Sequence, residues 1–227
     1  MNKRNQATVF VVDDDAGVRD SISELVESVG LHAECHASAM DFLSAWKPGR
    51  AGCLVLDVRM PDMSGLVLQR TLLESDFALP IIMLTGHGDV PIAVEAMKAG
   101  AFDFLQKPYR EQALLDSVHA ALSQDHATRQ ARQAEEELTR RIATLTPREV
   151  EVLDHVLAGE TSKNMAEQLD MSPRTAEAHR RNLLHKLGIG TVKELLVRIS
   201  PSVMSHDDPD LLLGPRVSGH PRTRSRT

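Results

Sequence analysis

Residues 8–15 read Thr-Val-Phe-Val-Val-Asp-Asp-Asp, a run of apolar and mostly β-branched residues that ends in three aspartates. A run that is apolar throughout, rather than alternating, is typical of a strand buried on both faces of a parallel sheet. Acidic residues directly after such a strand lie at the carboxyl edge of the sheet, where open parallel sheets bind ligands. This stretch therefore predicts both the fold class and the place of a functional site.

Three further apolar runs and several amphipathic segments follow the first run in alternation. The apolar runs are 53–56, 81–84 and 102–105, and the amphipathic segments are 16–29, 66–74, 91–99 and 111–123. Alternation of strands with helices predicts a parallel sheet that carries helices on both faces. We therefore expect residues 1–124 to form one doubly wound α/β domain.

The rest of the chain has a different composition. Residues 125–145 lack Gly and Pro and predict a helical linker, for which a weak coiled coil and a solvated helix remain equal alternatives. Residues 146–200 contain four short helical segments, with a capping box predicted at Thr146 and Glu149 and a helix end at Gly188. Residues 201–227 contain four prolines without apolar periodicity, which predicts a disordered tail.

Composition excludes several classes of function. Residues 1–124 carry 10 Lys and Arg against 17 Asp and Glu, so this domain repels polyanions. No aromatic residue follows Tyr109, which argues against a reader of single strands by base stacking in the C-terminal half. Cys35 and Cys53 lack the spacing of metal ligands or of a disulfide framework. No window resembles a secretory signal or a membrane span, so we expect a cytoplasmic protein without a membrane partner.

Polar residues follow the expected strands at the edge that the first aspartates occupy. They are Asp13 and Asp14 after the first strand, Asp57 after the third, Thr85 after the fourth and Lys107 after the fifth. Clustered carboxylates repel one another unless a cation is present, and an all-oxygen set suits Mg²⁺. A lysine and a hydroxyl at the same edge suit the oxygens of a phosphoryl group. The set predicts a carboxylate that accepts phosphate with the help of a metal ion.

Residues 8–122 resemble the receiver domain of two-component response regulators. The resemblance lies in Val-Val-Asp13-Asp14-Asp15, Leu-Asp57-Val-Arg-Met-Pro61-Asp-Met-Ser-Gly65, Leu-Thr85-Gly-His-Gly and Phe-Leu-Gln-Lys107-Pro108. It implies that Asp57 is the phosphoacceptor and that Asp13, Asp14 and Asp57 hold Mg²⁺. It further implies Thr85 as a switch hydroxyl, Lys107 as a phosphate contact and Phe104 as an aromatic that moves with Thr85. The same resemblance implies a dimerisation face that includes Val90, Val94, Lys98 and Asp103.

A helix-turn-helix is expected at 162–187, which suggests reading of the major groove of duplex DNA. Its second helix, 172–187, carries four basic residues against Glu177 within a neutral domain. The stretches Leu145-Thr-Pro-Arg-Glu149, Gly159-Glu-Thr-Ser-Lys163 and Arg174-Thr-Ala-Glu-Ala-His179-Arg-Arg-Asn182 resemble the LuxR-type helix-turn-helix. The resemblance implies that Glu177, Ala178 and Arg181 face base edges, and that Lys163, Thr175, His179 and Arg180 lie near phosphates.

Together the two domains resemble the NarL/FixJ family of transcriptional response regulators. The resemblance implies a sensor histidine kinase, promoter DNA and RNA polymerase as partners, and a homodimer after phosphorylation. Two other classes of protein, a phosphatase and a scaffold, fit the sequence less well. An aspartyl-phosphate phosphatase needs an acid two residues after its nucleophile, where Arg59 stands. A scaffold that works without phosphorylation would not need the complete polar set at the sheet edge. We therefore expect a switch protein rather than an enzyme.

Overall fold

The computed structural model describes residues 7–75, 77–86 and 90–199 of the 227-residue chain. The chain divides into two compact units at Arg132 and Gln133, here called the N-terminal unit and the C-terminal unit. The tail expected at 201–227 lies outside the described residues. Within the described ranges, no helix is both long enough and apolar enough to cross a membrane.

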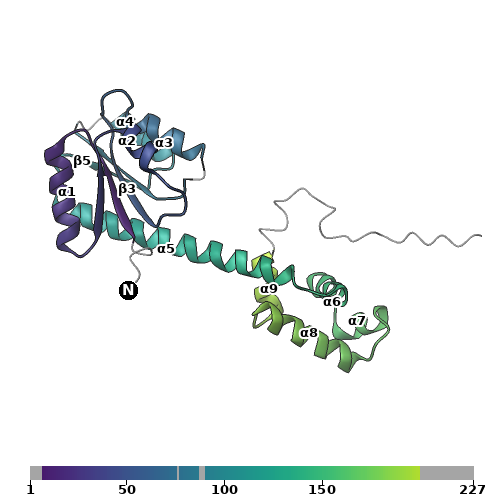
Figure 1. The fold of residues 1–227 in the computed structure, drawn as a ribbon. Helices are drawn as coiled ribbons and strands as arrows, with labels where there is room; N and C mark the ends of the chain where they lie inside the picture. The colour runs from purple at the N-terminus through teal and green to yellow at the C-terminus, as the bar shows by residue number, and fades with distance from the viewer. Residues whose placement is uncertain (1–6, 76, 87–89, 200–227) are drawn as a thin grey trace, which may run out of the picture. The chain divides into compact units, whose positions relative to one another are not determined.

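The N-terminal unit is built on one parallel sheet (Figure 1). Its strands are β1 (Thr8–Val12), β2 (His32–His36), β3 (Gly52–Asp57), β4 (Ile81–Thr85) and β5 (Asp103–Gln106). They lie in the order β2-β1-β3-β4-β5, and β1, which pairs with β2 and β3, is buried at every position. The order reverses direction at β1, which makes the carboxyl ends of β1 and β3 the expected ligand edge. The predicted doubly wound fold is confirmed.

Helices cover both faces of the sheet and create two apolar cores (Figure 1). One core is packed by α2 (Ala39–Ala45), α3 (Gly65–Leu73) and α4 (Val90–Lys98). The other is packed by α1 (Ala16–Ser28) and by the first part of α5 (Glu111–Ile142). Alternate residues of β1 serve the two cores, Phe10 and Val12 on one side and Val9 and Val11 on the other. This division explains why the strand is apolar at every position.

No apolar run marks the second strand, β2, in the sequence. Its residues His-Ala-Glu-Cys-His lie at the edge of the sheet, and only His36 is fully buried. An edge strand has one neighbour and less cover, so it does not need the continuous apolar sequence of the central strands. The strand is hard to predict because most of its residues are only partly buried and therefore need not be apolar. Its backbone pairing with β1 leaves no signal in the sequence.

The C-terminal unit contains α6 (Pro147–Leu157), α7 (Ser162–Gln168), α8 (Pro173–Leu187) and α9 (Val192–Ile199). The expected capping box is present at the start of α6, where Thr146 and Glu149 exchange hydrogen bonds with each other's backbone. Ser172 caps α8, whose first residue is Pro173, and Gly188 ends the helix with a left-handed backbone, φ 70°. The polypeptide therefore begins and ends these helices where its caps predict.

The long helix α5 contributes to both units instead of ending before a separate linker. Its first turns pack Leu114 and Val118 into the N-terminal unit. Near its end, Leu138 is only 6% exposed and packs with Val152, Leu153 and the other core residues of the C-terminal unit. The last turns of α5, from Leu138 to Ile142, are therefore part of the C-terminal core, although this end of the helix is predominantly polar in sequence.

Substitution of Leu138 by Ala tests this assignment. We expect Leu138→Ala to lower the free energy of unfolding of the C-terminal unit by about 2–5 kcal/mol, because it leaves a cavity in a closed core. Hydrogen exchange on the full chain measures the loss, with faster exchange in α6 and α8 and unchanged exchange in β1 and β3. The control Val197→Ala removes a side chain that is 66% exposed and should change little. Equal exchange in Leu138→Ala and the wild type would refute the assignment.

Candidate functional site

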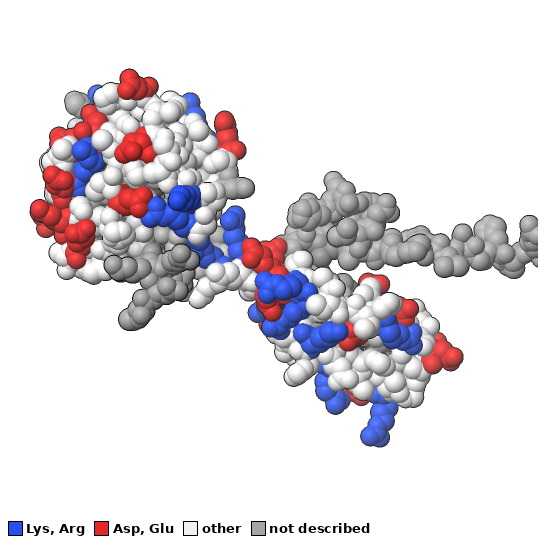
Figure 2. All heavy atoms as spheres, viewed as in Figure 1, with Lys and Arg blue, Asp and Glu red and all other residues white. Residues whose placement is uncertain are grey.

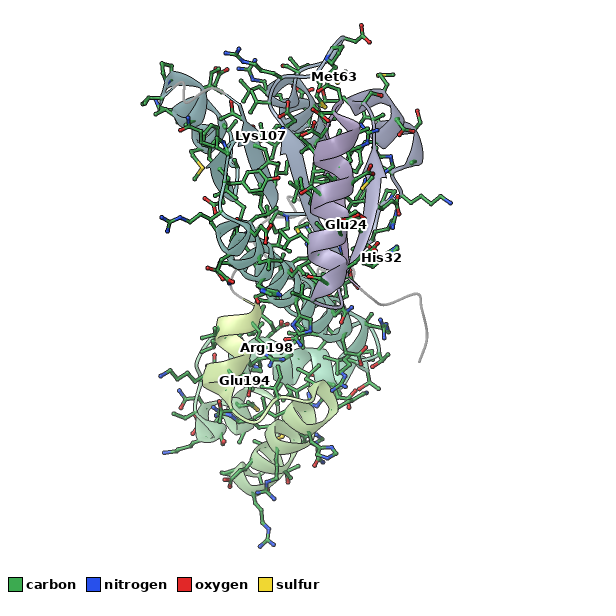
Figure 3. The ribbon with its side chains drawn as sticks, turned by 90° about the vertical axis from the view of Figure 1, so that its left-hand side faces the viewer. Glu24, His32, Met63, Lys107, Glu194 and Arg198 are labelled. Carbon is green, nitrogen blue, oxygen red and sulfur yellow. The ribbon has the colours of Figure 1, made fainter. Side chains whose placement is uncertain are left out.

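The carboxyl edge of the sheet brings together four of the side chains predicted from the sequence. Asp13 follows β1, Asp57 and Thr85 are the last residues of β3 and β4, and Lys107 follows β5. Asp13 is 1% exposed, Asp57 5% and Thr85 0%. Figure 3 places Lys107 and Met63 toward the end of the N-terminal unit that lies opposite His32, where β2 begins. Buried polar groups of this density need partners that compensate their charge.

Lys107 supplies this compensation. Its Nζ lies 2.6 Å from Asp13 Oδ2 and 2.6 Å from Asp57 Oδ1, so a single ammonium group bridges both buried carboxylates. The backbone N–H of Arg59 donates to Asp57 Oδ2 at 2.6 Å, and that of Asp15 donates to Asp13 Oδ1 at 3.0 Å. Each carboxylate thus has both oxygens engaged. The backbone N–H of Lys107 also donates to the Thr85 carbonyl at 2.6 Å, which ties β5 to β4 at this edge.

Burial and charge act against each other at this bridge. Burial raises the pKa of Asp57 above its ordinary value, and the hydrogen bond from Lys107 offsets only part of this effect. Burial by itself lowers the pKa of Lys107, but its bonds to Asp13 and Asp57 outweigh burial, so the pKa lies above the ordinary value. Lys107 therefore remains a cation, held next to a carboxylate whose negative charge is poorly solvated.

The three consecutive aspartates have three different environments. Asp13 is buried in the bridge, whereas Asp15 caps α1 by accepting from the N–H groups of Gly17 and Val18. Asp14 is exposed, and its carboxylate makes no hydrogen bond or ion pair with the described residues. The guanidinium of Arg19 donates to the carbonyls of Asp13, at 2.7 Å, and Asp14, at 3.0 Å. Sequence reasoning missed Arg19, because no local pattern reveals a bond to a backbone carbonyl.

Gly65 was quoted in the sequence analysis only as part of the receiver resemblance, without a structural role. It begins α3, and its N–H donates to the carbonyl of Val58 at 3.0 Å. A Cβ atom at this position would lie 2.1 Å from the carbonyl oxygen of Asp57. Only glycine allows α3 to approach the backbone of Asp57 this closely. An isolated glycine at the first position of a helix is the signal that could have found it.

The residues at this edge fit a magnesium ion by their donor chemistry. Within the described ranges, no three His, Cys, Asp or Glu side chains converge closely enough to form a complete protein cage. Mg²⁺ does not need one, since it commonly takes one or two carboxylates and keeps several waters. Asp13, Asp14 and Asp57 together carry three negative charges against the single positive charge of Lys107. The edge therefore retains an excess of negative charge that a small divalent cation suits.

In the C-terminal unit, α7 and α8 have the arrangement of a helix-turn-helix. Ala176, Leu183 and Leu187 of α8 are buried in the core, so the opposite face of the helix is open to solvent. That face carries Glu177, Ala178 and Arg181, and Lys163 on α7 and Thr175 are exposed as well. Figure 2 shows basic side chains protruding beneath α8, whereas acidic side chains are frequent on the visible face of the N-terminal unit.

Two of the expected phosphate contacts are only half exposed. They are His179 and Arg180, and Arg180 Nη1 donates to the carbonyl of Glu160 at 3.3 Å. Lys186, on the same helix, pairs with Glu149 Oε2 at 2.6 Å and donates to the carbonyl of Thr144. The hydrogen bond from Lys186 to Glu149, together with those from Thr146, lowers the pKa of Glu149 to about 2. The basic residues of α8 therefore form two sets. One set is exposed, and the other binds α8 to α6 and the residues that flank it.

The expected dimerisation residues lie on α4 and β5. Val90 is 71% exposed and Val94 45%, and Lys98 is exposed at the end of α4. Asp103 is half-buried, and its Oδ1 accepts from the N–H of Phe104 at 2.8 Å. Phe104 itself is partly buried against the core that α2, α3 and α4 share. The structure thus presents two large apolar side chains to solvent beside a lysine and an aspartate.

Comparison with known proteins agrees with both units. Residues 9–119 match the response regulator receiver domain, and residues 143–198 match the bacterial regulatory proteins of the luxR family. The chain is 47% identical to the transcriptional regulatory protein TdiR of Thauera aromatica over 192 residues, 85% of each chain. It is 44% identical over 188 residues to FixJ of Azorhizobium caulinodans, 83% of this chain and 89% of FixJ. The solved response regulator StyR superposes with a TM-score of 0.72 at 41% identity, covering 86% of this chain and 98% of StyR.

A receiver fold with a buried acidic edge and a LuxR-type helix-turn-helix define a DNA-binding response regulator. The chain belongs to the NarL/FixJ family of two-component transcriptional response regulators. The relatives named above are transcriptional regulators, which agrees with the expectation that the chain is not an enzyme.

Substitution of Lys107 by Met tests the bridge. We expect Lys107→Met to lower the free energy of unfolding by about 1–3 kcal/mol at pH 7, because it leaves two buried carboxylates without their cation. The pKa of Asp57, which burial already raises, should rise further above the unfolded value in the folded variant. The cost is therefore present above about pH 4 and disappears below it, where the unfolded carboxylates are also protonated.

Urea unfolding at several pH values measures this dependence. The control is Lys47→Met, which removes an exposed lysine of the same unit. A loss in Lys107→Met that is the same at pH 3 and pH 7 would show that the lysine acts through packing and not through charge.

Proposed function

We propose that Asp57 accepts a phosphoryl group from a sensor histidine kinase, and that the phosphorylated chain pairs and binds promoter DNA. The observation that carries the proposal is the Lys107 bridge, which holds Asp13 and Asp57 together at a buried edge. A purely structural ion pair does not need a second carboxylate, and replacement of buried charges by apolar residues is often neutral or stabilising. Two buried carboxylates on one lysine are better explained by chemistry at this edge.

The proposed transfer is a substitution at phosphorus. An oxygen of Asp57 forms a bond to the phosphorus of a phosphohistidine on the kinase, the P–N bond breaks, and the imidazole leaves with the electron pair. Lys107 then turns from the Asp57 oxygen toward a phosphoryl oxygen. Asp13, Asp14 and Asp57 would hold Mg²⁺, which supplies positive charge to the phosphoryl oxygens when it is bound. Arg19 keeps the backbone of Asp13 and Asp14 in place during the transfer.

The proposed switch passes from Thr85 to α4 and β5. Thr85 is buried next to the acidic edge, and its hydroxyl would bond a phosphoryl oxygen after transfer. Phe104 lies on the adjacent strand, in register with Met83 of β4. Its side chain is only partly buried, and we expect it to change orientation when Thr85 moves. A coupling free energy of about 1–3 kcal/mol is typical of such switches.

The exposed face of α4 is the proposed pairing surface. Val90 and Val94 are large apolar residues that gain most by burial against a second copy. A two-fold interface uses the same patch on both copies, so Lys98 of one chain can meet Asp103 of its partner and the reverse. Opposite charges on one self-complementary patch favour this pairing over random contacts.

Pairing places two C-terminal units on the same DNA. The exposed face of α8 would enter the major groove, with Arg181 and Glu177 reading base edges and Lys163 holding a phosphate. The enzymatic alternative has weaker support, because Arg59 stands where an aspartyl-phosphate phosphatase needs its acid.

Phosphorylation of Asp57 is tested with a small-molecule acyl phosphate and Mg²⁺. We expect the wild type to gain one acid-labile phosphate and to sediment increasingly as a dimer, because the switch rearranges the pairing surface on α4 and β5. Asp57→Asn should do neither while it remains folded. The control Asp62→Asn changes an exposed aspartate nearby and should behave as the wild type. Undiminished labelling of Asp57→Asn would exclude Asp57 as the acceptor, and equal dimer populations before and after labelling would exclude the pairing step.

The DNA contacts are tested by salt titration on matched and single-mismatch duplexes. We expect Arg181→Ala to lose about 1–3 kcal/mol and to discriminate less at one base position. Lys163→Ala should bind all duplexes more weakly and lower the salt slope by about one unit. The control Arg198→Ala removes a basic residue of α9 that is paired with Glu194 (Figure 3). An equal loss for Arg181→Ala on every duplex would make Arg181 a phosphate contact instead.

A further inference from the structure

Asp125 is an acidic residue that neither the acidic edge nor the DNA-binding face uses. It lies in α5, fourteen residues after the start of the helix at Glu111, and is 3% exposed. Its Oδ2 accepts from the N–H of Gly52 at 2.9 Å, across 73 positions of the chain. Gly52 begins β3, the strand that ends in Asp57. A buried carboxylate at this position needs a cation.

Arg129, one turn further along α5, supplies the positive charge. Its Nε lies 2.9 Å from both carboxylate oxygens of Asp125. Nη1 of the same guanidinium donates to the carbonyl of Gly49 at 3.0 Å, and Nη2 donates to the carbonyl of Arg50. One side chain therefore joins the helix to the loop between α2 and β3. We call this set, Asp125 and Arg129 with the backbone of Gly49, Arg50 and Gly52, the α5 clamp.

The loop that receives the clamp is itself held firmly. The guanidinium of Arg50 makes a bidentate pair with Glu34 of β2, at 2.9 and 2.6 Å, and lies 4.4 Å from the centre of the Phe10 ring. At Gly52 the backbone has φ 151°, and a Cβ atom there would lie 1.9 Å from the carbonyl oxygen of Thr8. The clamp thus binds α5 to a rigid part of the sheet and not to a loose loop.

The clamp is stronger than an ordinary surface ion pair. Exposed pairs at spacing i,i+4 contribute little because solvent competes for both partners. Here the Asp125 side chain is 4% exposed and the Arg129 side chain 27%, and each also binds backbone groups distant in sequence. The negative charge of Asp125 adds to burial in raising the pKa of the neighbouring Cys53 thiol to about 12. The geometry supports a fixed, charged contact at the end of the N-terminal unit.

The position of the clamp gives it a consequence for DNA binding. The apolar contacts of α5 with the N-terminal unit end at Ala121 and Leu122, and those with the C-terminal unit begin at Leu138. Asp125 and Arg129 lie between these two sets. We propose that they are positioning residues for DNA recognition: they fix the segment 123–129 to the N-terminal unit and so shorten the connection to each C-terminal unit.

The physical reason is effective concentration. The effect on DNA affinity rests on the proposed pairing of phosphorylated chains. In a pair, the C-terminal unit that binds the second half-site is already tethered to the one on the first. With the clamp, the connection is residues 130–137, and without it residues 123–137. Residues 123–137 are helical in α5, and release of the clamp frees this stretch to bend and fray. Effective concentration falls roughly as the −3/2 power of the length of a flexible tether, so the release should lower it about two- to threefold.

The first test uses the unphosphorylated full chain and does not depend on pairing. Arg129→Ala should raise hydrogen exchange of the amides at 124–132 at least about tenfold, and Arg129→Lys, which keeps a charge for Asp125, should raise it less. Arg140→Ala is the matched control, because Arg140 lies on the same helix and, among the described residues, pairs with Glu137, whose side chain is 41% exposed. Unchanged exchange at 124–132 in Arg129→Ala would overturn the clamp.

The second test measures the affinity of phosphorylated chains for duplexes with one half-site and with two. The gain from the second half-site should fall two- to threefold in Arg129→Ala, less in Arg129→Lys and not at all in Arg140→Ala, while affinity for one half-site stays constant. If Arg129→Ala does not fold, Arg129→Lys decides both tests. An unchanged gain in a variant with raised exchange would overturn the positioning role. A wild type without any gain would instead overturn the proposed pairing, and the exchange test would still judge the clamp.

Discussion

The acidic edge and its proposed chemistry both depend on the Lys107 ammonium between the carboxylates of Asp13 and Asp57. These residues come from three separate strands, so the bridge exists only when the sheet has its correct order. Burial makes the bridge necessary, because neither carboxylate can remain charged at such low exposure without a cation. The same burial keeps the charge of Asp57 poorly solvated and therefore reactive. Fold stability and the proposed chemistry thus share one set of atoms.

Much of the fold and of this edge follows from the sequence, because both depend on local patterns. The apolar runs at 8–12, 53–56 and 81–84 lie in β1, β3 and β4, and the polar residues that end them meet as expected. The strand β2 was not marked by such a run, since its place at the sheet edge relaxes the need for apolar residues. Arg19 and the α5 clamp could not be predicted, because a side chain that binds a distant backbone carbonyl leaves no periodic signal.

The division of the chain illustrates the same limit. Composition alone separates a polar helical segment, 125–145, from the domains on either side. In the structure that segment belongs partly to each unit. Asp125 and Arg129 bind the N-terminal unit, whereas Leu138 and Ile142 pack in the C-terminal core. Two contacts of different chemistry, one ionic and one apolar, thus determine how much of α5 belongs to each unit. A few buried residues outweigh the average polarity of the helix.

Chemical location of the phosphate tests most directly whether Asp57 is the acceptor. The full chain is treated with an acyl phosphate and Mg²⁺, reduced with borohydride, which converts an aspartyl phosphate to homoserine, and mapped by peptide mass spectrometry. We expect homoserine at position 57 and at no other aspartate, and none when Mg²⁺ is omitted. Homoserine at position 13 or 14, or an unmodified Asp57 in a chain that has taken up phosphate, would contradict this assignment.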